Sequence, residues 1–275
     1  MTLPRKRLCS NALRNARRWM ALAILGLTLL PAAAQTQAPP TTVVQRASRG
    51  TGFFISADGL LITAAHVVRD HDLLRVVIDG RQVRATLLRE DRARDLALLK
   101  VERSPVPYLN LGYSDNVPVG LEIYTIGYPQ LSNPMRSHPR FSSGILSADT
   151  GLNESADYFQ FSAPTESGNS GSPLLAGDLS VVGIVLSKLK VKDTDLTRGD
   201  IPQNVNFALK STHVAALLQS AGALAPSFRS IDPRSDRKPF EVFQAAWRAV
   251  VPVLAANLPQ GAVSAPDAAA GEIKP

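Results

Sequence analysis

A serine between glycines is the group in this sequence best placed to act as a nucleophile. Ser170 lies in the run Thr165-Glu166-Ser167-Gly168-Asn169-Ser170-Gly171-Ser172-Pro173. Small neighbours leave Ser170 Oγ accessible, and glycines let the backbone turn so that amide N–H groups converge on one point. A serine nucleophile needs both features, because those N–H groups stabilise the negative oxygen that forms when Oγ attacks a carbonyl. Taken alone, such a run is more typical of a turn between strands, so the hypothesis requires a base and an acid elsewhere.

A histidine and an aspartate supply those two groups. His66 follows the apolar run Leu60–Thr63 and two alanines, which leave room for a neighbouring side chain. Asp95 directly precedes the apolar run Leu96–Val101. An acid at this position either ends a loop or is a buried carboxylate, and a buried carboxylate needs a hydrogen-bond donor such as an imidazole N–H.

Together the three residues predict acyl-transfer chemistry. Ser170 would attack a carbonyl, His66 would take the serine proton and pass it to the leaving group, and Asp95 would hold the imidazole tautomer. The backbone of Gly168, Asn169 and Ser170 is predicted to form the oxyanion hole. An alternative order of serine, acid and histidine uses Ser170, Asp200 and His213. It is rejected because position 172 is serine where the Gly-x-Ser-x-Gly motif of α/β-hydrolases needs glycine.

The rest of the chain predicts an all-β fold. Short apolar or alternating segments are separated by tight turns such as Ala57-Asp58-Gly59 and Asp79-Gly80, and almost no helical pattern occurs before Ser211. Many short strands with tight turns favour β-barrels over alternating strands and helices.

Three motifs resemble those of chymotrypsin-fold (trypsin-like) serine proteases, and most closely their HtrA/Deg branch. They are Thr63-Ala64-Ala65-His66, Asp95-Leu96-Ala97-Leu98-Leu99 and Gly168-Asn169-Ser170-Gly171-Ser172-Pro173. The resemblance covers about residues 46–220. It implies two six-stranded antiparallel β-barrels, with His66 and Asp95 on the first and Ser170 on the second. It also implies an endopeptidase with protein or peptide substrates, no cofactor, and a role in protein quality control.

The same resemblance implies where substrate binds. The pocket would be lined by the segment before the serine and by a strand further along the chain, that is by Thr165, Glu166, Ser167, Val185, Leu186 and Ser187. Neither Ala163 nor Pro164 is acidic, although a pocket for Arg or Lys would need a carboxylate there. We therefore expect a small or medium aliphatic residue at P1, the substrate position before the cleaved bond.

A non-proteolytic alternative stays open. A protease-like fold can serve as a chaperone or binding module, or its triad can be intact while the oxyanion loop rests in a latent shape. Glu166, close before Gly168, is the residue that would influence such a loop.

The N-terminus reads as an export signal. Residues 1–34 combine a basic start, an apolar stretch from Ala21 to Leu30 and the small-residue site Ala32-Ala33-Ala34. We expect cleavage and a periplasmic or secreted protein; an uncleaved anchor is the alternative. The full chain has 30 Lys and Arg against 23 Asp and Glu. Without the six basic residues of the signal, the charges nearly balance, which gives no support for nucleic-acid binding.

The remaining composition sets further limits. The single cysteine, Cys9, lies in the signal, so the mature chain would have no disulfide, and no His/Cys cluster has metal-ligand spacing. Residues 35–45 are a predicted linker, 221–260 a helical extension with a helix over Phe240–Val250, and 261–275 a disordered tail. The last two segments are too short for the PDZ domain that follows the protease in HtrA proteins. The sequence gives no signal for oligomeric state.

Overall fold

The computed structural model describes residues 47–130, 138–186, 204–223 and 228–257. The predicted signal (1–34), linker (35–45) and tail (261–275) lie outside the described residues, as do Ser187 and Asp200. Within the described ranges, no helix has the length and apolar character needed to span a membrane.

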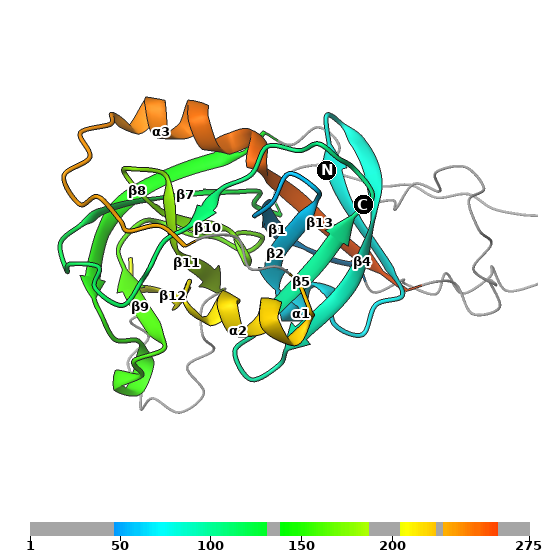
Figure 1. Cartoon of the computed structure of the whole chain (residues 1–275), viewed down its shortest axis with the longest axis horizontal. Helices are drawn as coiled ribbons and strands as arrows, with labels where there is room; N and C mark the ends of the chain where they lie inside the picture. Colours follow the sequence, from blue (N-terminus) through cyan, green and yellow to red (C-terminus); the bar gives the residue numbers. More distant parts are fainter. Residues whose placement is uncertain (1–46, 131–137, 187–203, 224–227, 258–275) are drawn as a thin grey trace, which may run out of the picture. The chain divides into compact units, whose positions relative to one another are not determined.

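The first barrel is a closed ring of six antiparallel strands. Its order is β1-β13-β3-β4-β5-β2 (Figure 1). The strands are β1 (Ala47–Phe54), β2 (Leu60–Ala64), β3 (Leu73–Ile78), β4 (Arg81–Asp91), β5 (Leu96–Val101) and β13 (Val250–Ala256). Every residue of β2 is buried, as is all of β5 except Lys100, because both are nearly continuous apolar runs. The short helix α1 (Ala65–Val68) follows β2 without a break.

The second barrel also has six antiparallel strands, in the order β10-β7-β8-β9-β12-β11, and pairing of β10 with β11 closes it. Its strands are β7 (Glu122–Gly127), β8 (Arg140–Ala148), β9 (Tyr158–Phe161), β10 (Pro173–Ala176), β11 (Ser180–Leu186) and β12 (Asn206–Lys210). The two-residue strand β6 (Asn110–Leu111) adds in parallel to β11, and the 3-10 turn η1 (Leu152–Glu154) links β8 to β9. The prediction of an all-β fold with two six-stranded barrels is confirmed.

Two longer helices lie late in the chain. Helix α2 (His213–Ser220) buries Val214, Leu217 and Leu218. Helix α3 (Pro239–Ala246) packs on the second barrel, where the Phe243 ring meets Phe141 of β8 edge-on, with centroids 5.7 Å apart. The 3-10 turn η2 (Trp247–Ala249) leads from α3 into β13.

The predicted helix over Phe240–Val250 is corrected by the structure. The helix ends at Ala246, and Val250–Ala256 is a strand in the first barrel, so the segment 221–260 is only partly helical. Figure 1 shows this late segment among the strands from the start of the chain. It pairs with β1 from Phe53 to Ala47 and with β3 from Val76 to Leu73, and all seven of its residues are buried.

A proline inside this strand is tolerated for a local reason. Pro252 lies opposite Thr51. The Thr51 N–H donates to Ser170 O at 2.9 Å, and the Thr51 carbonyl accepts from Thr63 Oγ1 at 2.7 Å. Both backbone groups of Thr51 therefore have partners outside β13. The missing N–H of Pro252 leaves no Thr51 group without a hydrogen bond.

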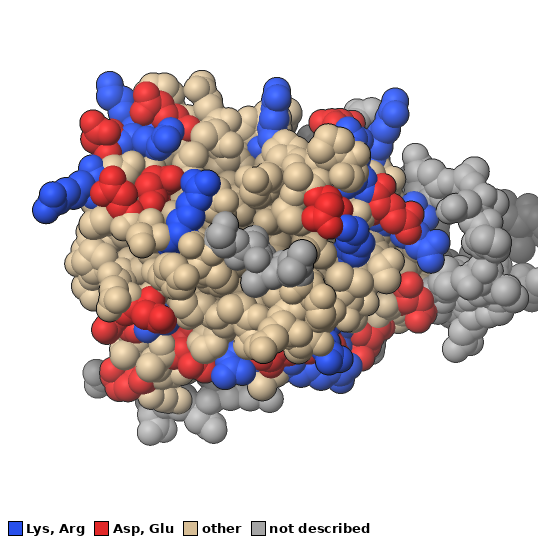
Figure 2. Space-filling model, in the orientation of Figure 1, with Lys and Arg blue, Asp and Glu red and all other residues tan. Residues whose placement is uncertain are grey.

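The surface mixes both signs of charge. On the face in Figure 2, Lys and Arg alternate with Asp and Glu around a centre of other residues. This distribution agrees with a high sequence pI that comes mainly from the first 34 residues.

Candidate active site

The two barrel strands beside His66 and Asp95 bring these side chains together. His66 lies in α1 just after β2, and Asp95 just before β5. Because β2 and β5 pair antiparallel with Ala64 opposite Leu96, the end of one strand meets the start of the other. Asp95 Oδ2 lies 2.6 Å from His66 Nδ1, and Asp95 Oδ1 accepts the His66 backbone N–H at 2.7 Å. One carboxylate therefore fixes both the ring and the backbone of the histidine.

This arrangement leaves the other ring nitrogen for proton transfer. With Nδ1–H directed at Asp95, neutral His66 presents Nε2 as its proton acceptor. Asp95 has φ of 55°, in the left-handed region that Asp adopts more readily than most residues. Arg69 Nη2 lies 3.6 Å from Asp95 Oδ1 and adds positive charge beside the carboxylate.

The serine loop comes from the second barrel, between β9 and β10, and packs against the first. Gly171 makes the closest approach: a Cβ there would lie 2.2 Å from Thr51 O and 2.8 Å from Ala64 N, and its φ is 87°. This contact places the residue after Ser170 against the end of β2, two residues before His66. Within the described residues no hydrogen bond joins Ser170 Oγ to His66. Catalytic hydrogen bonds of this kind are often long before substrate binds and tighten in the reacting complex.

Successive carbonyls of the serine loop are all bonded. Ser167 O accepts from Gln130 N–H at 2.9 Å, Gly168 O from Thr51 Oγ1 at 2.7 Å, and Asn169 O from Ser172 N–H at 2.9 Å. In a trans peptide the N–H points opposite to the carbonyl. The N–H groups of Gly168 and Ser170 therefore point away from these partners, and neither has an acceptor among the described residues. Two free donors in one loop can stabilise a developing oxyanion.

Asn169 differs from the other two residues predicted for the oxyanion hole. Its N–H donates to Glu166 O at 3.0 Å and closes a turn. Gly168, at the third position of that turn, has φ of 101°, as a type II turn requires. The Asn169 N–H is thus used within the loop, and the N–H groups of Gly168 and Ser170 are the two candidate donors for an oxyanion hole.

The residues predicted to bind substrate fall into two groups. Glu166 and Ser167 are exposed, and half-buried Thr165 donates from Oγ1 to Asn206 Oδ1 at 2.7 Å. Val185 and Leu186 are buried. Val185 contacts the serine loop through its backbone, which accepts from Gly171 N–H at 2.7 Å and donates to Ser172 O at 2.8 Å.

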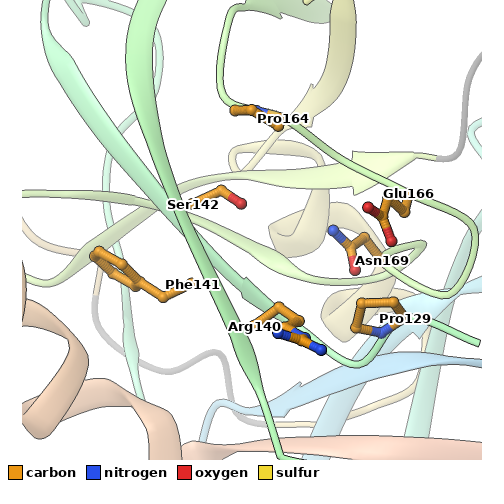
Figure 3. Close-up of a pocket in the computed structure, with 7 residues that line it drawn as sticks. All are labelled: Pro129, Arg140, Phe141, Ser142, Pro164, Glu166 and Asn169. Carbon is orange, nitrogen blue, oxygen red and sulfur yellow. The ribbon is translucent and has the colours of Figure 1, made fainter. Parts of the chain in front are cut away.

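A pocket of about 340 Å³ adjoins the same loop (Figure 3). It is lined by Pro129, Arg140, Phe141, Ser142, Pro164, Glu166 and Asn169. Glu166 and Asn169 were predicted as site residues, but Pro129 and residues 140–142 come from other segments that no local pattern links to the serine loop.

Two titratable groups near the site have clear structural roles. Burial raises the pKa of Tyr128 to about 12, so its hydroxyl remains a donor, to Val250 O at 3.2 Å. His213 Nε2 lies 3.2 Å from Asp157 Oδ1, and burial lowers the pKa of His213 although Asp157 opposes this. This pairing, together with the all-β fold, agrees with the rejection of His213 as a base for Ser170.

Comparison with known proteins now gives the family. The model of the trypsin-like peptidase domain matches residues 50–184, which include His66, Asp95 and Ser170. The chain contains a trypsin-like peptidase domain. The matched stretch includes strands of both barrels and ends before β12 and β13.

Two named relatives are proteases of the HtrA/Deg branch. The chain is 36% identical over 145 residues to a probable periplasmic serine endoprotease, DegP-like, of Chlamydia pneumoniae, covering 51% of this chain and 29% of that protein. It is 33% identical over 180 residues to the mitochondrial serine protease HTRA2 of Drosophila pseudoobscura pseudoobscura, covering 64% and 39%. An uncharacterized protein of Sinorhizobium fredii is 39% identical over 176 residues, covering 64% and 28%. The chain thus spans less than two fifths of the length of these relatives.

The fold has a counterpart among solved structures. The serine endoprotease of Yersinia pestis aligns with a TM-score of 0.50 and 23% identity, over 62% of this chain and 57% of that chain. The resemblance to HtrA-like proteases of the chymotrypsin fold is confirmed.

Replacing Gly168 by alanine should destabilise the peptidase domain. The new Cβ would lie 2.5 Å from Tyr128 O and 2.7 Å from Gln130 N, in a left-handed conformation that costs alanine roughly 1–2 kcal/mol before any clash. We expect Tm to fall by roughly 4 °C or more. Gly120→Ala is the matched control, because Gly120 has φ of 92° but nothing within 4 Å of its would-be Cβ. Equal Tm values for the two variants would contradict close packing at Gly168.

Proposed function

We propose that the chain is an exported serine endopeptidase in which His66, Asp95 and Ser170 form the catalytic triad. The observation that carries this proposal is the 2.6 Å contact between His66 Nδ1 and Asp95 Oδ2 beside a serine loop in which two N–H groups have no acceptor among the described residues. The family of the domain supports the same reaction class.

In the acylation half, Ser170 Oγ attacks the peptide carbonyl carbon while His66 Nε2 takes the Oγ proton. The carbonyl oxygen becomes an oxyanion and accepts from the N–H groups of Gly168 and Ser170. Asp95 stabilises the imidazolium that forms. When the tetrahedral intermediate collapses, the C–N bond breaks, and His66 gives its proton to the departing amine.

In the deacylation half, water replaces the amine. His66 takes a proton from the water as its oxygen attacks the acyl carbon, and the same two N–H groups hold the second oxyanion. Collapse of this intermediate breaks the bond to Oγ, returns the proton to Ser170 and releases a carboxylic acid. The cycle consumes one water and needs no cofactor.

The substrates we propose are proteins or peptides with a small or medium aliphatic P1 residue. The absence of an acidic side chain at Ala163 and Pro164 supports this choice over Arg or Lys. Export through residues 1–34 is supported by relatives whose names describe them as periplasmic. We further propose a role in protein quality control, in line with the HtrA/Deg resemblance.

We also propose that the oxyanion hole is formed without an activator. Turning the Gly168 N–H away from the hole would rotate the Ser167–Gly168 peptide and break the bond from Gln130 N–H to Ser167 O. Loss of this hydrogen bond disfavours the rotation by about 0.5–1.5 kcal/mol. The latent or chaperone-like alternative predicts the opposite behaviour in the experiment below.

The experiment is labelling of the purified chain with a fluorophosphonate, followed by intact mass measurement. We expect one adduct on the parent and none on Ser170→Ala. Ser143→Ala, which changes an exposed serine of β8, should label like the parent. A folded parent that takes up no label would refute an active triad and favour the latent or binding alternative.

A further inference from the structure

Thr51 in β1 is fully buried. It has hydrogen bonds to the serine loop and to Tyr128, which follows β7. Its Oγ1 donates to Gly168 O at 2.7 Å and accepts from Tyr128 N–H at 2.9 Å. Its backbone N–H donates to Ser170 O at 2.9 Å. The proposed mechanism assigns this residue no role.

The direction of the hydroxyl bond is fixed by its surroundings. A threonine hydroxyl has one proton to give. Because Tyr128 N–H can only donate, it occupies an acceptor position of Oγ1, and the single proton is left for Gly168 O. Thr51 Oγ1 is therefore the donor in its hydrogen bond with Gly168 O.

The bond from Thr51 Oγ1 holds the Gly168–Asn169 peptide, which lies between the peptides that carry the Gly168 and Ser170 N–H groups. The Gly168–Asn169 peptide is bonded at its carbonyl by Thr51 Oγ1 and at its N–H by Glu166 O. The peptides on either side carry the N–H groups of Gly168 and Ser170. Glycine tolerates a wide range of φ and ψ, so Gly168 does not hold this geometry by itself.

We propose that Thr51 is a positioning residue for the oxyanion hole. It touches no reacting atom and acts through the Gly168 carbonyl and the Ser170 carbonyl. The inference rests on the proposed peptidase function, and it adds that a residue of the first barrel keeps the loop of the second barrel in its productive shape.

The test replaces the hydroxyl while keeping the shape of the side chain. Thr51→Val removes the donor and leaves Gly168 O and Tyr128 N–H without that partner, whereas Thr51→Ser keeps both bonds. Thr63→Val is the matched control, because Thr63 is equally buried and its Oγ1 also donates to a backbone carbonyl, that of Thr51. All four proteins are compared for kcat and KM on one aliphatic-P1 peptide.

A positioning role predicts an effect on kcat rather than on KM. We expect Thr51→Val to lose roughly 10- to 100-fold in kcat, less than the roughly 10²- to 10³-fold cost of removing an oxyanion donor outright. KM should stay within about twofold, since the hole binds the transition state more strongly than the substrate. Thr51→Ser should stay near the parent, and affinity for a peptide boronate, which forms a tetrahedral adduct, should fall in parallel with kcat.

A second measurement separates failure of this inference from failure of the proposed function. Amide hydrogen exchange at Asn169 and Gln130 reports loop order whether or not the protein cleaves peptides. We expect faster exchange at both amides in Thr51→Val than in Thr63→Val, and parent-like exchange in Thr51→Ser. If Thr51→Val does not fold, Thr51→Ala takes its place in the same comparison.

The outcomes are distinct. An unlabelled parent with Thr51-dependent exchange would refute the peptidase function and leave the loop contact intact. A labelled parent whose Thr51→Val and Thr63→Val variants match in kcat and in exchange would overturn the role of Thr51.

Discussion

A chain that ends at residue 249 is expected to be largely unfolded and without peptidase activity. It keeps α3 but lacks β13, the strand that lies between β1 and β3 in the first barrel. Both neighbours would then expose unpaired backbone groups along one edge, and the barrel that carries His66 and Asp95 could no longer close.

The side chains of β13 account for the size of this effect. Val250, Val251, Val253 and Leu254 are each 4% exposed or less. Burying one such side chain contributes roughly 1.5–3 kcal/mol, so the four together contribute roughly 6–12 kcal/mol. Domains of this kind are stable by only about 5–15 kcal/mol in total. Loss of the strand therefore removes a free energy comparable with the whole stability of the fold.

Circular dichroism, thermal unfolding and fluorophosphonate labelling measure the result. A chain that ends at residue 260 keeps β13 and is the control for truncation itself; we expect it to behave like the parent. In the full-length chain, Val253→Asp tests the same strand, because it buries a charge without a partner. Leu87→Asp on β4 is its control, since Leu87 is 37% exposed. A cooperative unfolding transition and normal labelling in the chain ending at 249 would contradict the structural role of β13.

The sequence predicted the barrels because their strands carry local signals. Apolar runs such as Leu96–Val101, separated by turns such as Asp79-Gly80, identify strands without knowledge of their partners. His66 and Asp95 could be identified from the sequence for the same reason, since each lies next to an apolar run. Their separation of 2.6 Å follows from the pairing of β2 with β5, which no local pattern specifies.

The place of β13 depends on contacts that are distant in sequence. Val250–Leu254 is short and contains Pro252, and a proline argues against a strand inside a sheet. The helix predicted over Phe240–Val250 overlaps this strand at Val250, whereas the observed helix ends at Ala246. Only the structure brings Thr51 opposite Pro252 with its backbone groups already bonded to Ser170 and Thr63.

Sequence-based prediction of the loop Gly168–Ser170 has the same limit, here for single N–H groups. Gly168, Asn169 and Ser170 were predicted together because they are consecutive in a glycine-rich run. The direction of each N–H depends on where the carbonyl of the same peptide is bonded. Ser167 O and Gly168 O are bonded by Gln130 and Thr51, which come from other segments of the chain, whereas Asn169 O is bonded within the loop by Ser172. A sequence motif can therefore place the hole but not decide which of its amides point into it.

Asp95→Asn should leave the fold intact and lower kcat by about 10⁴. Asparagine keeps an oxygen that can accept the His66 backbone N–H, and it tolerates the left-handed conformation of residue 95. Its other group, however, is an NH₂ donor. That donor would face His66 Nδ1 and favour the tautomer with the proton on Nε2, which cannot accept a proton from Ser170.

The measurement is kcat on a peptide substrate and the rate of fluorophosphonate labelling, with thermal unfolding to verify the fold. Asp91→Asn is a matched control: this carboxylate also accepts backbone N–H groups, those of Ala93 and Arg94, but does not contact His66. We expect Asp91→Asn to change kcat by less than about tenfold, because it acts only on a loop neighbouring the site.

If Asp95→Asn retained parental kcat, Asp95 would have no part in the triad. If both variants lost kcat and stability together, the loss would reflect the loop they share. A large loss of kcat in Asp95→Asn alone, at unchanged Tm, would mean that the carboxylate sets the proton position on His66.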